Sequence, residues 1–135
     1  QAPKGTQLPI TPKFKGNVTA RYDFNFWNLD AHLQAVGTYQ GSSWADLRIQ
    51  APDLVTGVIV PVRSALGKQP SYGTADFSFG VERDNWSAEI SLENAFDERA
   101  QLYRYAECTT QVCSRQPYIV SNRPRTISIN FGQKF

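Results

Sequence analysis

The chain has 135 residues, of which 41% are hydrophobic and 19% charged, and its 14 Lys and Arg nearly balance its 12 Asp and Glu. A helical membrane protein is excluded because no apolar run approaches the ~18 residues of a spanning helix, and the small, mixed charge argues against a nucleic-acid partner. A transmembrane β-barrel remains open, since each of its strands needs only every second side chain to be apolar.

The first predicted hairpin comes from two runs of alternating apolar and polar residues. Residues 14–26 place apolar residues or glycine at even positions and polar residues at odd positions. Residues 28–30 provide a turn, and residues 32–40 alternate again, with Leu33 and Tyr39 on one face. Because successive side chains of a strand point to opposite faces, both runs predict strands with one apolar face.

A second hairpin and a last strand follow the same pattern. Residues 73–82 and 86–93 alternate on either side of Asp84 and Asn85, which predict a tight turn. Residues 124–135 alternate up to the C-terminus, with Gln133 as a polar exception. The chain therefore predicts an all-β, antiparallel, up-and-down sheet of about five strands, with no helical period.

The connections between the predicted strands are of two kinds. Both turns are a few residues long, whereas residues 43–71 and 97–123 form long loops rich in Gly, Pro, Ser and Gln. Short turns at one end of the strands and long loops at the other are typical of outer-membrane barrels. Cys108 and Cys113, in the second loop, predict one short disulfide in an exported protein or two free thiols in a cytosolic one.

The main alternative is a soluble β-sandwich or a soluble small-ligand β-barrel, in which the apolar faces form a core. A transmembrane barrel is favoured because the first predicted strand exceeds the ~9 to 11 residues that cross a bilayer. The charges on the polar faces also suit a wide aqueous interior. Finally, aromatic residues gather beside the short turns, where an interfacial girdle would lie. They are Tyr22, Phe24, Phe26, Trp27, Phe79 and Trp86.

Several segments resemble the late strands of TonB-dependent outer-membrane receptors. They are residues 8–15 before the first strand, 70–72 before the third, 94–97 after the fourth, and 124–126 before the last, together with the C-terminal Phe135. The sequence Asn-Ala-Phe-Asp at 94–97 is similar to the Asn-Leu-Phe-Asp segment of that family. The loop at 106–113 resembles receptors of alphaproteobacteria. The segments also follow one another in the order and at the spacing of that family. The resemblance covers nearly all of residues 1–135.

The resemblance implies the C-terminal part of a 22-stranded barrel in the bacterial outer membrane, with extracellular long loops and a periplasmic C-terminus. It implies active uptake of iron-siderophore complexes or of similar scarce nutrients. The implied partners are the remainder of the barrel and a plug domain, which the chain lacks, TonB through the missing N-terminal part, the barrel-assembly machinery, lipid and lipopolysaccharide. The implied barrel-assembly signal consists of Ile127, Ile129, Phe131 and Phe135.

The sequence offers little chemistry for catalysis or metal binding. A Ser/His/Asp site would have to use Asp30 and the single histidine, His32, whose place beside a turn favours an interfacial role. Glu89 and Glu93 share one strand face and suit an acid/base pair, but two hydrated charges explain them better. Since Cys108 and Cys113 lack a nearby histidine, a disulfide is favoured over a metal site. We therefore expect no enzyme, no metal and no cofactor.

The long loops combine aromatic and cationic side chains that could bind an anionic or aromatic ligand. For any single residue the simpler explanation is packing of the aromatics on one another and contact of the cations with lipopolysaccharide phosphates. A passive porin or an autotransporter barrel would share the strands and is a further alternative. The ligand candidates are Trp44, Arg48, Arg63, Lys68, Tyr103, Arg104, Tyr105, Arg115 and Tyr118.

Five strands are too few for a complete barrel, because the smallest common barrels have eight. The first and the last predicted strand would then be open edges, and each unpaired backbone group in hydrocarbon costs several kcal/mol. We therefore expect residues 16–26 and 126–135 to pair with strands outside this chain.

Overall fold

A computed structural model describes residues 5, 7–47, 50–53, 55–61, 66–105 and 118–134. Every regular element in this part of the chain is a β-strand, and each strand pair of known register is antiparallel. The prediction of an all-β, antiparallel protein is therefore confirmed. No helix among the described residues has the length and apolar character needed to cross a membrane.

The chain divides into two compact units. The first, here called the sheet unit, consists of residues 15–39, 73–99 and 123–135. The second, the loop unit, consists of residues 1–14, 40–72 and 100–122, so it contains the long connection 43–71 and most of the long connection 97–123.

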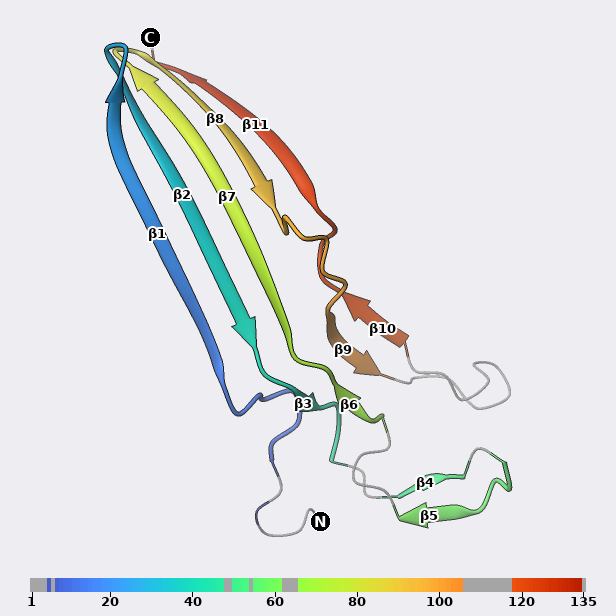
Figure 1. The fold of residues 1–135 in the computed structure, drawn as a ribbon. Helices are drawn as coiled ribbons and strands as arrows, with labels where there is room; N and C mark the ends of the chain where they lie inside the picture. Colours follow the sequence, from blue (N-terminus) through green and yellow to red (C-terminus); the bar gives the residue numbers. More distant parts are fainter. Residues whose placement is uncertain are drawn as a thin grey trace. The chain divides into compact units, whose positions relative to one another are not determined.

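The sheet unit contains one five-stranded sheet (Figure 1). Its strands, in their order across the sheet, are β1 (Lys15–Phe26), β2 (Leu29–Gln40), β7 (Tyr72–Arg83), β8 (Trp86–Glu93) and β11 (Thr126–Gln133). Each strand lies beside the long strand that precedes it in the chain, and β1 and β11 form the two edges. These five strands correspond to the five alternating runs of the sequence.

The first turn lies earlier than the sequence predicts. Its two residues are Trp27 and Asn28, with φ angles of +48° and +59°, and β2 begins directly afterwards at Leu29. Positive φ at both central positions is typical of the tight turns that match the twist of a hairpin. Asparagine adopts such angles readily, but the tryptophan gave no turn signal. The second turn, Asp84–Asn85, is where the sequence places it.

The loop unit contains three short two-stranded sheets. They pair β3 (Ser43–Trp44) with β6 (Lys68–Gln69), β4 (Gln50–Pro52) with β5 (Ile59–Pro61), and β9 (Gln101–Tyr105) with β10 (Tyr118–Ser121). A buried hydrogen bond of 2.6 Å joins the hydroxyl of Ser43 to the side-chain oxygen of Gln69 across β3 and β6. The amide of Gln69 in turn donates to the carbonyl oxygen of Leu102, at 3.2 Å.

Few apolar side chains are buried. Among the described residues the buried hydrophobic ones are Ala31, Ala45 and Ala100, and all three are small. Water-soluble domains of this size instead bury large aliphatic and aromatic side chains. The larger apolar side chains of the sheet unit are therefore found on its surface.

Candidate functional site

One face of the sheet is apolar and exposed. The antiparallel register places Phe79 beside Ile90 and Ile90 beside Ile129, so these three side chains form a row across β7, β8 and β11. Phe77, Leu92 and Ile127 form the next row. In β11, Ile127 is 68% exposed, Ile129 77% and Phe131 69%. This surface, here called the apolar face, continues in β1 with the exposed Val18 and Tyr22.

Aromatic rings gather at the end of the sheet where the short turns lie. The rings of Phe26 and Trp27 stack with their centroids 4.6 Å apart, and those of Trp86 and Phe131 stack at 6.4 Å. Trp27, in the first turn, is 84% exposed. Rings that combine an apolar body with a polar group favour the boundary between hydrocarbon and water. Phe26, Trp27 and Trp86 therefore lie beside the short turns, where the sequence places them.

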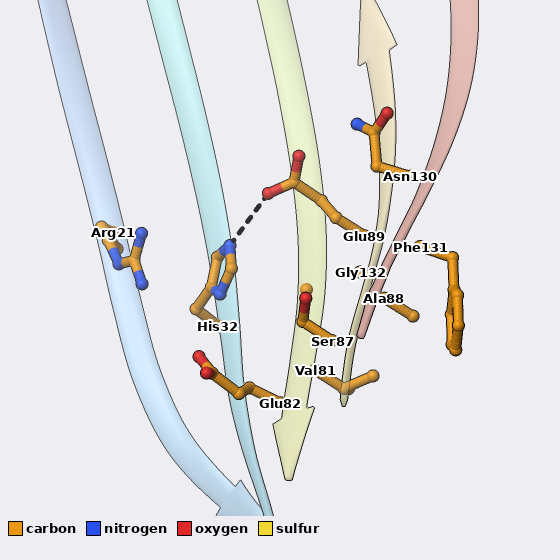
Figure 2. Close-up of a pocket in the computed structure, with 11 residues that line it drawn as sticks. Arg21, His32, Val81, Glu82, Ser87, Ala88, Glu89, Asn130, Phe131 and Gly132 are labelled. Atoms are coloured by element: carbon orange, nitrogen blue, oxygen red, sulfur yellow. Dashed lines mark ion pairs between the residues drawn. The ribbon is translucent and has the colours of Figure 1, made fainter. Parts of the chain in front are cut away.

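The opposite face of the sheet is polar and contains a hollow of about 380 Å³ (Figure 2). His32 of β2 extends over Gly80 of β7 towards Glu89 of β8, and its Nε2 lies 3.4 Å from the Glu89 carboxylate. The imidazole occupies the space where any other residue at position 80 would place its Cβ. The absence of a side chain at Gly80 thus allows the His32–Glu89 contact. This contact was missed in the sequence, where the three residues lie far apart.

Charges on the polar face lie close to opposite charges. Arg21 lies 2.9 Å from Asp23, and Lys134 lies 3.6 Å from Glu82. Glu89 and Glu93, considered as an acid/base pair, have separate partners, since Glu93 lies 3.9 Å from Arg123. Within the described part of the chain, no cluster of three or more His, Cys, Asp or Glu could hold a metal ion. The arrangement is that of an exposed surface on which these charged groups lie near groups of opposite sign.

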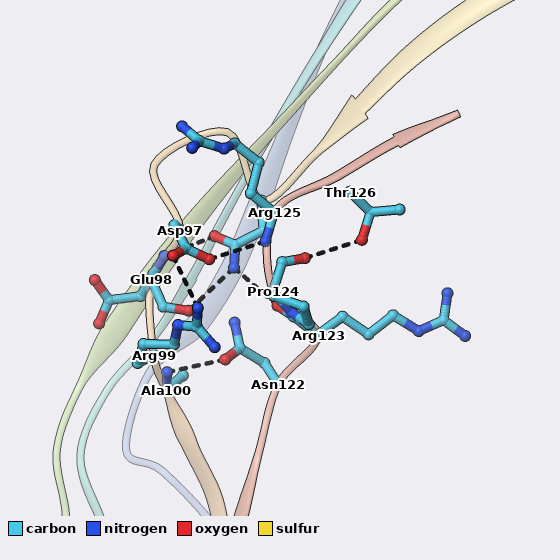
Figure 3. Close-up of polar contacts among 10 residues, drawn as sticks. Asp97, Glu98, Arg99, Ala100, Asn122, Arg123, Pro124, Arg125 and Thr126 are labelled. Atoms are coloured by element: carbon cyan, nitrogen blue, oxygen red, sulfur yellow. Dashed lines mark hydrogen bonds and ion pairs between the residues drawn. The ribbon is translucent and has the colours of Figure 1, made fainter. Parts of the chain in front are cut away.

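Residues 94–97 follow β8 in the chain, and hydrogen bonds connect Asn94 and Asp97 to residues 123–125, which precede β11. Figure 3 shows Asp97 beside Arg125. The buried side chain of Asn94 donates to the carbonyl oxygens of Arg123, at 2.9 Å, and Glu98, at 3.0 Å, and accepts from the Glu98 N–H. Asn94 has a φ of +48°, which asparagine adopts more readily than most residues. Three backbone groups are thereby satisfied by one side chain, so Asn94 is a structural residue.

Asp97 completes this connection. Its carboxylate accepts the backbone N–H of Arg125 at 2.9 Å and lies 2.9 Å from the guanidinium of Arg99. The backbone hydrogen bond from Arg125, followed by the hydrogen bond from Arg99, lowers the pKa of Asp97 below its usual value of 3.8. The ionised carboxylate is therefore the form that holds the start of β11.

Three ligand candidates of the long loops lie together in the loop unit. Tyr105 and Tyr118 are paired residues of β9 and β10, and Tyr103 lies two residues before Tyr105 on the same side. The ring of Tyr105 stacks on that of Tyr103, at 5.8 Å, and on that of Tyr118, at 5.4 Å. These three rings, here called the tyrosine face, belong to segments separated by more than ten residues of sequence.

The other described ligand candidates do not join the tyrosine face. Arg104 alternates with the tyrosines along β9, and its guanidinium donates to the side chain of Gln101 and to the carbonyl oxygen of Leu66. Trp44 and Lys68 are paired across β3 and β6. Arg48, Arg63 and Arg115, the predicted disulfide of Cys108 and Cys113, and Phe135 lie outside the described residues.

No known protein family matches the chain, and neither a curated protein nor a solved structure matches it.

Proposed function

We propose that the chain forms the last strands of an outer-membrane β-barrel that belongs to a TonB-dependent transporter of iron-siderophore complexes or similar scarce nutrients. The apolar face contacts the acyl chains of the lipid, and the polar face lines the aqueous interior of the barrel. The observation that supports this proposal is the exposed apolar face opposite a charged face on one sheet. This division is what a barrel strand in lipid requires.

The dimensions of the strands support the same arrangement. β1, β2 and β7 each have 12 residues, and ~9 to 11 residues suffice for a tilted strand to cross a bilayer. The aromatic rings at the short turns then lie at one interface of the membrane. In this orientation the short turns and the C-terminus are periplasmic, and the long connections are extracellular.

The energetic cost of exposure argues against the soluble alternative. Leaving a side chain such as Ile129 or Phe131 in water forgoes about 1.5–3 kcal/mol compared with burying it. A soluble module would cover this face, whereas in the described part of the chain it is open. Acyl chains supply the cover without any further protein.

The open edges of the sheet agree with a larger barrel. β1 and β11 each have one neighbour among the described strands, and hydrocarbon does not tolerate unpaired strand edges. In the proposed transporter these edges pair with strands from the remainder of a 22-stranded barrel. The plug domain inside that barrel and TonB complete the transport machinery.

Labelling of cysteines in intact cells tests this location. In a variant with Cys108→Ser and Cys113→Ser, one cysteine is introduced at Val58 of a long loop or at Asn85 of a short turn. A membrane-impermeant maleimide should label Val58→Cys in intact bacteria, and Asn85→Cys only after the outer membrane is opened. Equal labelling of both before opening, or of neither after opening, would contradict the proposed topology.

A further inference from the structure

Arg125 lies directly before β11, beside the apolar face. Thr126, the first residue of β11, belongs to the polar face, and Figure 3 shows the side chain of Arg125 pointing away from it. Since successive side chains of a strand alternate between the two faces, Arg125 lies on the same side as Ile127. Its side chain is exposed. A cation therefore borders the apolar face at the end of the sheet where the long connections begin.

This arginine differs from the others of the sheet unit in having no carboxylate partner. Among the described residues, none forms an ion pair or a hydrogen bond with its guanidinium. The carboxylate of Asp97 accepts the backbone N–H of Arg125 but pairs with the guanidinium of Arg99. A charge beside hydrocarbon is costly unless it is paired, so the position of Arg125 favours an anion from outside the described chain. The arginines that lie within 4.0 Å of a carboxylate are Arg21, Arg83, Arg99 and Arg123.

An apolar groove of about 280 Å³ lies on the apolar face beside this arginine. Ile127, two residues after Arg125, forms part of its wall. An acyl chain fits such a groove, because burial of each methylene group against apolar walls is favourable. The apolar residues that line the groove come from β2, β7, β8 and β11, and they are Leu33, Phe77, Phe79, Ile90, Leu92 and Ile127.

We infer that Arg125 and this groove together bind one molecule of lipid A, with a phosphate on the guanidinium and an acyl chain in the groove. Lipid A is the phosphorylated, acylated sugar that anchors lipopolysaccharide, so it combines both groups in one molecule. Its phosphate monoesters carry more charge than the phosphodiester of a phospholipid, and a guanidinium binds phosphate oxygens through two parallel hydrogen bonds.

The inference rests on the proposed function in one respect. That function places the long connections, and with them Arg125, at the outer leaflet of the membrane, where lipid A is found. Binding at Arg125 itself can be measured with lipid A in both leaflets, so that it does not depend on the orientation of the barrel.

Photo-cross-linking from the groove tests this inference. The assembled barrel carries Phe77→p-benzoylphenylalanine, which keeps the phenyl ring, in phosphatidylcholine vesicles with equal small amounts of lipid A, dephosphorylated lipid A and phosphatidylglycerol. Mass spectrometry of the cross-linked peptide gives the share of each lipid. Lipid A should be cross-linked about fivefold more than its dephosphorylated form, and phosphatidylglycerol should lie between them. Arg125→Gln should remove most of this preference.

Arg83→Gln is the matched control, because Arg83 alternates in step with Phe77 on β7, lies at the opposite end of that strand and is 52% exposed. It should keep the native preference. Arg125→Gln retains the backbone hydrogen bond to Asp97, and the total amount of cross-linked lipid reports whether each barrel is inserted.

Two results would overturn the inference. One is cross-linking of dephosphorylated lipid A or of phosphatidylglycerol as readily as lipid A, and the other is an effect of Arg125→Gln no larger than that of Arg83→Gln. Neither would alter the labelling of Val58→Cys and Asn85→Cys, which tests the proposed location separately.

Discussion

Gly80 shows how a single hydrogen in place of a side chain permits a contact across three strands. A Cβ at this position would overlap the imidazole of His32, which would have to turn away from Glu89. Because the imidazole is the free end of a side chain over an open hollow, it can turn aside, and we expect Gly80→Ala to lower the free energy of unfolding by about 0.5–1.5 kcal/mol, the cost of an unfavourable rotamer. Urea unfolding of the assembled barrel in lipid vesicles measures this change. Gly37→Ala, whose Cβ meets nothing within 4 Å, should change stability little.

The overlap with His32 can be separated from any backbone effect at position 80 by a double-mutant cycle. In a His32→Ala background, Gly80→Ala should lose most of its cost, giving a coupling free energy of at least about 0.5 kcal/mol. An equal cost with and without the imidazole would show that His32 does not pack on Gly80.

Among the polar residues that hold the end of β8 against the start of β11, Asn94 is expected to affect stability most when it is substituted. Asn94→Ala removes the partner of the Arg123 and Glu98 carbonyls and of the Glu98 N–H, and it places alanine at a positive φ. We expect a loss of about 1–3 kcal/mol in the free energy of unfolding. Asn94→Gly should lose less, because glycine adopts this φ without strain. Unfolding of Asn94→Ala at the same urea concentration as the native chain would contradict this role.

The free energy of unfolding should depend on pH through the carboxylate of Asp97. Its pKa is lowered in the folded state, so its contribution is present above the unfolded value of 3.8 and is lost as the pH falls through the lower, folded pKa. The stability difference between native chain and Asp97→Asn should therefore be constant from pH 7 to 5 and shrink at the acid end. Unfolding curves at a series of pH values measure it. A difference that grows as the pH falls would refute the assignment.

At the level of the strand, a charged residue should destabilise the protein at one position of β11 and have little effect at the next. Ile129 belongs to the apolar face and Asn130 to the polar face. In the assembled barrel in lipid vesicles, Ile129→Arg should cost about 2–4 kcal/mol if it lies near the middle of the bilayer, and Asn130→Arg should cost little. Urea unfolding of both variants gives the comparison. Similar effects of the two substitutions would contradict a lipid-facing Ile129, because both residues are exposed in the chain itself.

The long strands were predictable because alternation over eight to twelve residues is a strong signal. β8 runs from Trp86 to Glu93 as the sequence indicates, and β1 differs from its predicted range by one residue. The short strands of the loop unit were missed, since two to five residues contain too few positions for a period. Trp27 was missed as a turn residue because the hairpin register, rather than the intrinsic preference of tryptophan, places it there.

The candidate sites were less predictable than the strands. The sequence selects Tyr103, Tyr105 and Tyr118 among nine ligand candidates, but only the pairing of β9 with β10 brings them together. The same nine candidates include Arg104, but its hydrogen bond with Gln101 forms only in the folded loop unit. His32 and Glu89 meet through strand order and a glycine between them, and neither feature has a local sequence pattern.

In the whole molecule, the two faces of the sheet require different surroundings. An apolar face, a charge-balanced polar face and two open edges are compatible with a segment of a membrane barrel. The same sheet in water would require another protein surface over Ile127, Ile129 and Phe131. Both arrangements keep the described strands, so only a measurement of the surroundings separates them.

Site-directed spin labelling along β11 makes that measurement most directly. Single labels are placed at positions 127 to 131 in the assembled barrel, from which Cys108 and Cys113 have been removed, and the barrel is inserted in lipid vesicles. They report collisions with oxygen, which dissolves in lipid, and with a water-soluble nickel complex. If β11 is a barrel strand in lipid, accessibility should alternate with a period of two: positions 127, 129 and 131 are accessible to oxygen, and positions 128 and 130 are accessible to nickel. Equal accessibility of all five positions, or protection of the odd positions from oxygen, would contradict it.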